Sequence, residues 1–178
     1  MATPTSLPGS FSDFSALTAL QMNDLRGAFR ILQVASTTKT DTFTVTSSSY
    51  TDVTGLSVTI TPRSTSSNIF VLASLSATGQ SATTNLFSRL VRGSTAIGIG
   101  DAAGNRIRST SNARDQQFPS SLILAFLDSP ATTSATTYKV QVTNQSTGVI
   151  YVNRSEVDTD ASFSPRGIST ITVFEVSA

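Results

Sequence analysis

The chain has 178 residues, a formal net charge of +1 and a hydrophobic share of 38%, which fits one domain of ordinary size and an arm. It contains no cysteine and no histidine, so disulfides, thiolate metal sites and the commonest general base are excluded. Only two of its twelve basic residues are lysines, and the sequence has no clustered basic stripe of the kind that binds nucleic acid.

Residues 1–36 are typical of an attachment arm. The first thirteen residues contain two prolines and a Gly-Ser pair without periodicity, and they lack the charged and apolar regions of a secretory signal. The next segment follows helix rules, with Ser15 as N-cap and Gly27 as the stop. The apolar residues that we expect to make its attachment and oligomer contacts are Leu17, Leu20, Met22, Leu25 and Phe29. A helix of about three turns is not stable alone in water, so this arm requires a partner surface.

From Phe29 the period changes to two, which predicts strands. We expect them at 30–35, 41–45, 50–53, 56–61, 68–75, 86–92, 95–99, 121–127, 136–144, 149–153 and 169–176. The strand that starts at Asn68 is apolar on both faces and is predicted to be central, and the strand at 121–127 is predicted to be buried. The turn at Gly93-Ser94 predicts a hairpin between its two neighbours.

Polar loops are expected at 100–117 and 154–167. Short strands separated by turn signals predict an all-β sandwich, and the lack of a repeat argues against a propeller or solenoid. The longest apolar run, at 122–127, is too short to cross a bilayer, so we expect no membrane partner. The predicted organisation is an arm at 1–36 with one short helix and a β-sandwich head at 37–178.

Basic residues are concentrated in one part of the sequence, mostly in the loop at 100–117. This loop contains Arg106, Arg108 and Arg114. Arginine suits bidentate recognition of carboxylate or phosphate, so one interpretation is a ligand-facing loop for an anionic host glycan or a neighbouring subunit. The interleaved acids favour the other interpretation, in which these arginines pair with Asp101 and Asp115.

No pattern predicts a metal site, a cofactor or catalysis. Asp158 and Asp160, with Glu156, have a spacing that begins some calcium loops, but the other spaced ligands and the turn glycine are missing. A solvated loop is therefore preferred there. A serine nucleophile would have to use Lys39 or Lys139 as its base, in threonine-rich strands that we expect to be exposed.

The order of several segments resembles the trimeric jelly-roll heads of the tumour-necrosis-factor and complement-globular-head type. These segments are Tyr50–Pro62, Ile69–Ala77, Leu86–Ile99, Leu122–Leu127, Thr136–Val142 and Ile171–Val176. In the first part of the chain, Leu17–Leu25, Leu32–Val34, Thr37–Phe43 and Val53–Pro62 resemble segments of tailed-bacteriophage fibre and virion proteins.

The resemblance implies a non-enzymatic, homotrimeric virion component that is made in the host cytoplasm. Its arm would bind other virion proteins, and its jelly-roll-like head would be distal. The leading expectation is a tail fibre or tail appendage. The alternatives are a capsid decoration (cement) protein that stabilises the shell, or a carbohydrate-binding head that recognises a host surface glycan.

Overall fold

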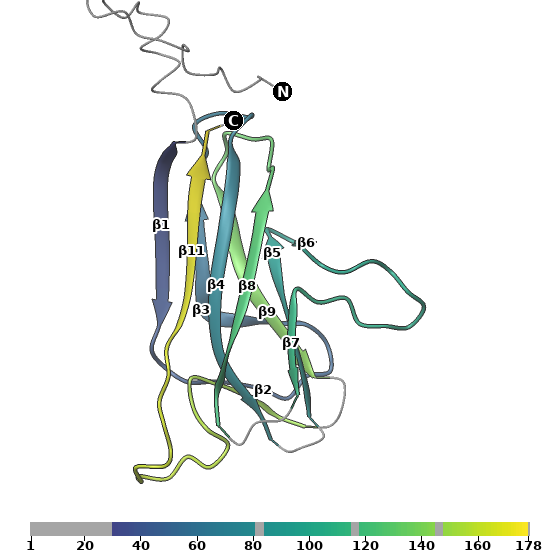
Figure 1. Cartoon of the computed structure of the whole chain (residues 1–178), viewed down its shortest axis with the longest axis vertical. Coiled ribbons are helices and arrows are strands. Elements are labelled where there is room, and N and C mark those ends of the chain that lie inside the picture. Colours follow the sequence, from purple (N-terminus) through teal and green to yellow (C-terminus); the bar gives the residue numbers. More distant parts are fainter. Residues whose placement is uncertain (1–29, 81–83, 115–117, 145–147, 178) are drawn as a thin grey trace, which may run out of the picture.

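A computed structural model describes residues 30–80, 84–114, 118–144 and 148–177 (Figure 1). The helix predicted at 15–27 and the five apolar residues expected to make attachment contacts lie outside these ranges. Within them every regular element is a strand, and the chain is all-β. The described part accordingly contains no helix able to span a membrane.

Eleven strands occur in the described ranges, and they form two sheets. Their bounds are β1 Ile31–Lys39, β2 Phe43–Val45, β3 Thr51–Ile60, β4 Asn68–Gly79, β5 Asn85–Arg92, β6 Thr95–Ile97, β7 Ser111–Arg114, β8 Ser120–Asp128, β9 Thr136–Asn144, β10 Ile150–Val152 and β11 Ser169–Val176. Sheet A has the order β1-β11-β4-β10-β2, with β8 also paired to β4. Sheet B has the order β3-β9-β5-β6, with β7 also paired to β5.

All strand pairs are antiparallel, and the main ones are nested along the chain. The first strand pairs with the last, β1 with β11 in sheet A, and then β3 pairs with β9 in sheet B. Inside these, β4 pairs with β8 in sheet A and β5 with β7 in sheet B. These four pairs follow one another as in one long hairpin and alternate between the sheets. The short pair of β2 with β10, nested between the first two of them, also belongs to sheet A.

One hydrophobic core lies between the sheets, because strand residues alternate between the inner and outer faces. The inward side chains of β3 are Leu56, Val58 and Ile60, and all three are buried. Across the core, β4 contributes Ile69, Val71, Ala73 and Leu75. Tyr138 of β9 is fully buried in this core.

Several predicted boundaries change in the structure. The strands expected at 50–53 and 56–61 are one strand, β3, with an irregular register between Asp52 and Ser57. Gly55 lies in that interval with φ +82, a backbone conformation that glycine adopts without strain. The loop expected at 100–117 contains β7. β1 continues to Lys39, across the boundary expected at residue 36.

The strand at 121–127 was expected to be buried, and that prediction is wrong for one of its faces. β8 pairs only with β4 and forms an edge of sheet A. Leu122 and Leu124 face the core, whereas Ile123 and Leu127 are more than half exposed. β4, in contrast, has β11 along one edge and β8 along the other, which confirms its central position.

A buried polar cluster joins the two sheets at Asp128, the last residue of β8. Its carboxylate accepts hydrogen bonds from Arg92 Nη1 at 2.8 and 2.9 Å and from the Tyr138 hydroxyl at 2.6 Å. Burial, and next the hydrogen bond to Asp128, raise the pKa of Tyr138 well above its usual value. Arg92 and Tyr138 belong to sheet B, so the hydrogen bonds of Asp128 connect β8, the edge strand of sheet A, to sheet B.

A second buried carboxylate, Glu175 of β11, connects sheet A to the loop after β3. Glu175 is fully buried and accepts hydrogen bonds from Gln33 Nε2 at 2.6 Å and from the backbone N–H of Arg63 at 2.7 Å. Burial alone would raise the pKa of Glu175, but these hydrogen bonds and one from Ser67 outweigh it and lower the pKa. Gln33 Nε2 also donates to the carbonyl of Thr61, which fixes the same loop.

Candidate functional site

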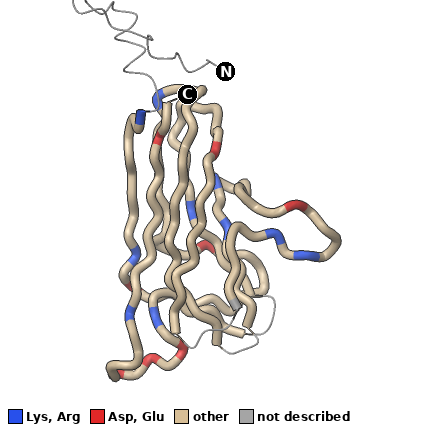
Figure 2. Tube along the Cα trace, viewed as in Figure 1, with Lys and Arg blue, Asp and Glu red and all other residues tan. Residues whose placement is uncertain are grey.

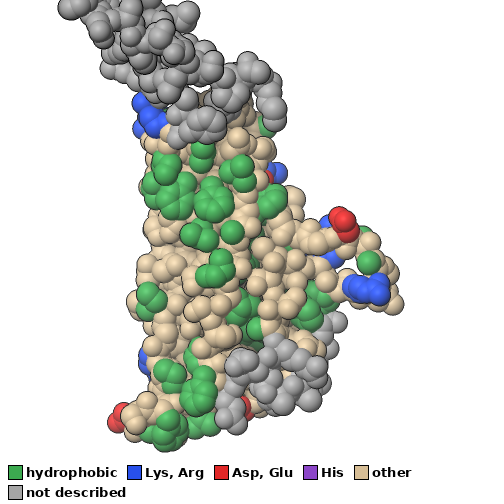
Figure 3. Space-filling view, in the orientation of Figure 1, with side chains coloured by type: hydrophobic (Ala, Val, Ile, Leu, Met, Phe, Trp, Pro, Cys, Tyr) green, Lys and Arg blue, Asp and Glu red, His purple; other side chains and the backbone are tan. Residues whose placement is uncertain are grey.

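The outer face of sheet A, the side that points away from the core, carries exposed apolar side chains and no charge on its long strands. Twelve of its positions on four strands, seven apolar and five serine or threonine, are Val34, Ser36, Thr38, Phe70, Leu72, Ser74, Ile123, Ala125, Leu127, Thr170, Thr172 and Phe174. None of them carries a charge. Val34, Ile123 and Leu127 are 54%, 56% and 55% exposed. Figure 3 shows these hydrophobic side chains gathered over β1, β11, β4 and β8.

The strand register places the apolar residues of this face in a continuous row. Val34 lies opposite Phe174, Phe174 opposite Phe70, and Phe70 opposite Leu127. The rings of Phe70 and Phe174 are 6.1 Å apart, within the range of favourable aromatic pairs. Cross-strand packing stabilises the row, yet its two ends remain open to solvent. This combination is typical of a surface that another protein covers.

The outer face of sheet B is polar, in contrast to the outer face of sheet A. Asp52 accepts hydrogen bonds from Lys139 Nζ at 2.7 Å and Gln141 Nε2 at 2.6 Å. Arg89 donates to Gln141 at 2.9 Å and lies 3.8 Å above the Tyr50 ring. Partial burial would raise the pKa of Asp52, but the two hydrogen bonds lower it. Sheet B thus presents a solvated surface, and only sheet A presents an apolar one.

The predicted ligand-facing arginines are only partly brought together. Arg106 and Arg108 lie on the loop between β6 and β7, which projects from the body of the protein (Figures 1 and 2). Arg106 donates to the carbonyl of Ala103 at 3.2 Å and Arg108 to that of Gly100 at 2.6 Å, in place of the expected pairing with Asp101. Arg114 is the last residue of β7, opposite Asn85, and its side chain lies outside the described atoms.

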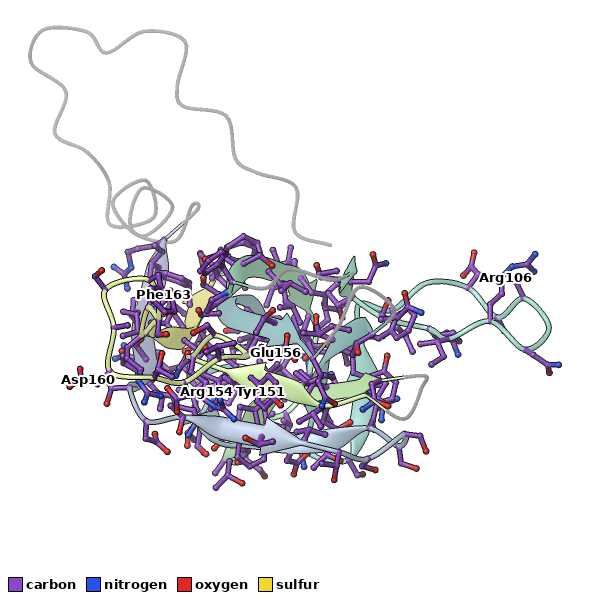
Figure 4. All side chains as sticks on the ribbon, turned by 90° about the horizontal axis from the view of Figure 1, so that it is seen from below. Arg106, Tyr151, Arg154, Glu156, Asp160 and Phe163 are labelled. Carbon is purple, nitrogen blue, oxygen red and sulfur yellow. The ribbon has the colours of Figure 1, made fainter. Side chains whose placement is uncertain are left out.

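The projecting loop is anchored at its base. Gly98 has φ +57, and a Cβ there would lie 2.8 Å from the Phe126 ring, so only glycine fits. The Tyr50 hydroxyl donates to the carbonyl of Arg108 at 2.8 Å. Figure 4 shows Arg106 far from the residues of the loop at 154–168, so the two predicted loops do not form one site.

The loop at 154–168, here called the distal loop, lies at the opposite end of the molecule from β1's start (Figure 1). Asn153 holds its base, with φ +60 and a buried side chain. The Asn153 amide donates to the carbonyls of Lys39 at 2.9 Å and Asp41 at 3.0 Å and accepts from the Ser169 hydroxyl at 2.7 Å. These contacts join the loop to the ends of β1 and β11.

Arg154 organises the first half of the distal loop. Its guanidinium lies 4.0 Å above the Tyr151 ring and donates to the carbonyls of Ser155 and Glu156. Asp158 is 3.8 Å from Arg154 and 2.7 Å from Arg166. Asp158 therefore lies between two guanidinium groups, which offset its charge. Among the described residues, no group of three metal-ligating side chains exists.

A small pocket opens beside the distal loop, at the end of the molecule shown in Figure 4. It has a volume of about 180 Å³ and is lined by Phe118, Ser155, Glu156, Val157 and Phe163. Phe118 and Phe163 are 51% and 61% exposed. Sequence reasoning missed this pocket, although a phenylalanine within a polar loop, as in Ser-Phe163-Ser, was an available signal.

Neither lysine considered as a catalytic base is placed to activate a serine. Lys39, which was expected to be exposed, is 3% exposed and its Nζ lies 2.5 Å from Asp41. Lys139 is held by Asp52. No protein-family model matches this chain, and no curated protein matches it. Function is therefore inferred from the surfaces that the protein presents.

Proposed function

We propose that this chain is a non-enzymatic structural protein of a bacteriophage particle, a homotrimer that forms a tail fibre or tail appendage. The observation that carries the proposal is the apolar, uncharged outer face of sheet A. A monomer in solution gains nothing from a row of exposed valine, isoleucine, leucine and phenylalanine side chains. Covering these side chains in an assembly gives each fully buried one about 1.5–3 kcal/mol of transfer free energy.

The nested strand pairs support a jelly-roll head. A jelly roll has two packed antiparallel sheets of four strands each with Greek-key connections. The four nested pairs of this chain alternate between sheets A and B in that manner. This topology agrees with the resemblance to trimeric jelly-roll heads, through which the trimer enters the proposal. The phage particle enters it through the other resemblance, that of segments in the first part of the chain to bacteriophage fibre and virion proteins.

The position of the chain ends supports attachment at one end of the head. The backbone N–H of Ser177 donates to the carbonyl of Arg30 at 3.0 Å, so the described part begins and ends at the same place (Figure 1). The part of the predicted arm that precedes the described residues, 1–29, therefore joins the head at the end opposite the distal loop. In the proposed particle the arm binds other virion proteins and the distal loop faces outward.

Self-association through sheet A is tested by Val34→Asp, with Thr59→Asp as the matched control on the outer face of sheet B. We expect the unaltered chain to have the mass of a trimer by light scattering. Val34→Asp buries a charge without a partner at the interface and should weaken association by about 100-fold or more. Thr59→Asp should leave the trimer intact.

Both positions are exposed in the single chain, so neither change should alter its circular dichroism. A monomeric unaltered chain, or a Val34→Asp variant that associates as tightly as the parent, would contradict the proposed interface.

The role of the arm is tested by deleting residues 1–29. We expect the head to remain a soluble trimer because its core and the sheet A face lie entirely in the remaining chain. The truncated protein should no longer join the particle. Normal incorporation of the truncated head would contradict the attachment role, and counting copies per particle separates a tail appendage, with few copies, from a capsid decoration protein, with hundreds.

A further inference from the structure

The pocket beside the distal loop combines apolar walls with one unpaired charge. Phe118, Val157 and Phe163 are each more than half exposed around it. Glu156 supplies a carboxylate that has no hydrogen-bond or ion-pair partner among the described residues. Exposed aromatic side chains beside an unpaired carboxylate mark a binding site more specifically than either feature alone.

The backbone that carries Glu156 is held in place before any ligand arrives. Arg154 binds the carbonyls of Ser155 and Glu156 at 3.2 and 3.3 Å, and the Ser155 hydroxyl donates to the carbonyl of Val157 at 2.7 Å. A β-bridge between Arg154 and Arg166 closes the loop. A ligand that binds this pocket therefore does not have to order this part of the loop, which favours affinity.

The local charge favours a cation. The distal loop contains three carboxylates and two guanidinium groups, and both guanidinium groups contact Asp158. The negative charges of Glu156 and Asp160 are left without ion pairs among the described residues. Aromatic faces also attract cations, because the ring quadrupole is negative above and below the ring.

We propose that this pocket binds an organic ammonium group, with its apolar substituents against Phe118 and Phe163 and its charge beside Glu156. The pocket offers few hydrogen-bonding groups for the several hydroxyls of a neutral sugar, since the Ser155 hydroxyl already donates to the backbone. Its volume of about 180 Å³ is below that of pockets for drug-sized ligands, so it fits one headgroup. Quaternary ammonium compounds, amino sugars and lysine side chains share this chemistry.

The test is an NMR titration of the full chain with choline chloride and with its neutral isostere 3,3-dimethylbutan-1-ol. Choline should bind in the millimolar range and more weakly as salt is added, whereas the isostere should bind about 10-fold more weakly. Glucosamine and Nα-acetyl-lysine amide, whose side-chain ammonium is free, are the other two ammonium probes. Methyl glucoside is the neutral sugar. Binding by any of the ammonium probes that depends on Glu156 supports the proposal and identifies the source.

Three variants assign the contacts. Glu156→Gln keeps the shape of the side chain and should weaken choline binding about 10-fold. Phe163→Leu keeps an apolar side chain but removes the ring, and should weaken it about 3-fold. Asp160→Asn, on the same loop but outside the pocket lining, should change it less than about 2-fold, because exposed charges are screened.

Equal binding of choline and its isostere would overturn the proposal, as would binding of methyl glucoside that survives Glu156→Gln. The absence of binding by all three ammonium probes, with the circular dichroism of a folded protein, would also overturn it. None of these results bears on whether sheet A forms a trimer, so this proposal and the proposed function fail separately.

Discussion

Replacing Asp128 by alanine is expected to lower the free energy of unfolding by about 3–4 kcal/mol. The change leaves the Tyr138 hydroxyl buried without a partner and removes the charge-assisted bonds to Arg92. Tyr138→Phe removes only the hydroxyl and should cost about 1.5–3 kcal/mol. Urea unfolding followed by circular dichroism measures both, at one protein concentration, because the proposed self-association would make the midpoint depend on concentration.

The control is Asp52→Ala, which removes an exposed carboxylate from the outer face of sheet B and should cost less than about 1 kcal/mol. If Asp128→Ala lowered the free energy of unfolding no more than this control does, the contacts of Asp128 between the sheets would not stabilise the fold.

Tyr138 adds a second readout at high pH. The pKa of Tyr138 is raised on folding, so the stabilisation that this shift gives is fully present below about pH 10 and declines above it. The free energy of unfolding of Tyr138→Phe should therefore lack this part of the decline at high pH.

Glu175→Gln is expected to lower the free energy of unfolding at pH 7 by about 2–3 kcal/mol. The carboxylate of Glu175 accepts from Gln33, Arg63 and Ser67, and a glutamine amide would turn an N–H₂ donor toward one of these donors. The effect should be seen as a lower urea midpoint with an unchanged slope.

The same variant predicts a pH dependence. The pKa of Glu175 is lowered on folding, so its stabilisation is present above the unfolded value of about 4.3 and is lost as pH falls through the folded value. The stability difference between parent and Glu175→Gln should therefore shrink below about pH 4. A difference that stayed constant from pH 7 to pH 3 would show that the variant acts through packing alone.

Much of the strand arrangement could be predicted from the sequence, because one buried face leaves a period of two. The strands at 136–144 and 169–176 have the predicted bounds, and the hairpin at Gly93-Ser94 is present with Arg92 opposite Thr95. β7 could not be found this way, because Ser111-Asn-Ala-Arg has no apolar alternation and joins the sheet through backbone hydrogen bonds. The two pieces of β3 looked separate because Gly55 interrupts the pattern.

The buried charges could not be predicted, because their partners are distant in sequence. Glu175 occupies an inward position of its strand, as a core residue would. Its hydrogen-bond donors, Gln33 and Arg63, lie more than a hundred residues earlier in the sequence. The two-sided apolar pattern of β4 predicted that this strand is central, and it lies between β11 and β8. Only the register shows that Val34, Phe174, Phe70 and Leu127 form one row.

The pairing of β1 with β11 also decides when this protein can fold. Sheet A needs its final strand, which ends at Val176, before β1 has a neighbour. A growing chain must therefore be made as far as Val176 before β1 can pair. Contacts between strands this distant in sequence make folding slow. Until β11 is in place, the apolar strands are open to aggregation, and a chain that stops short of β11 forms no complete head.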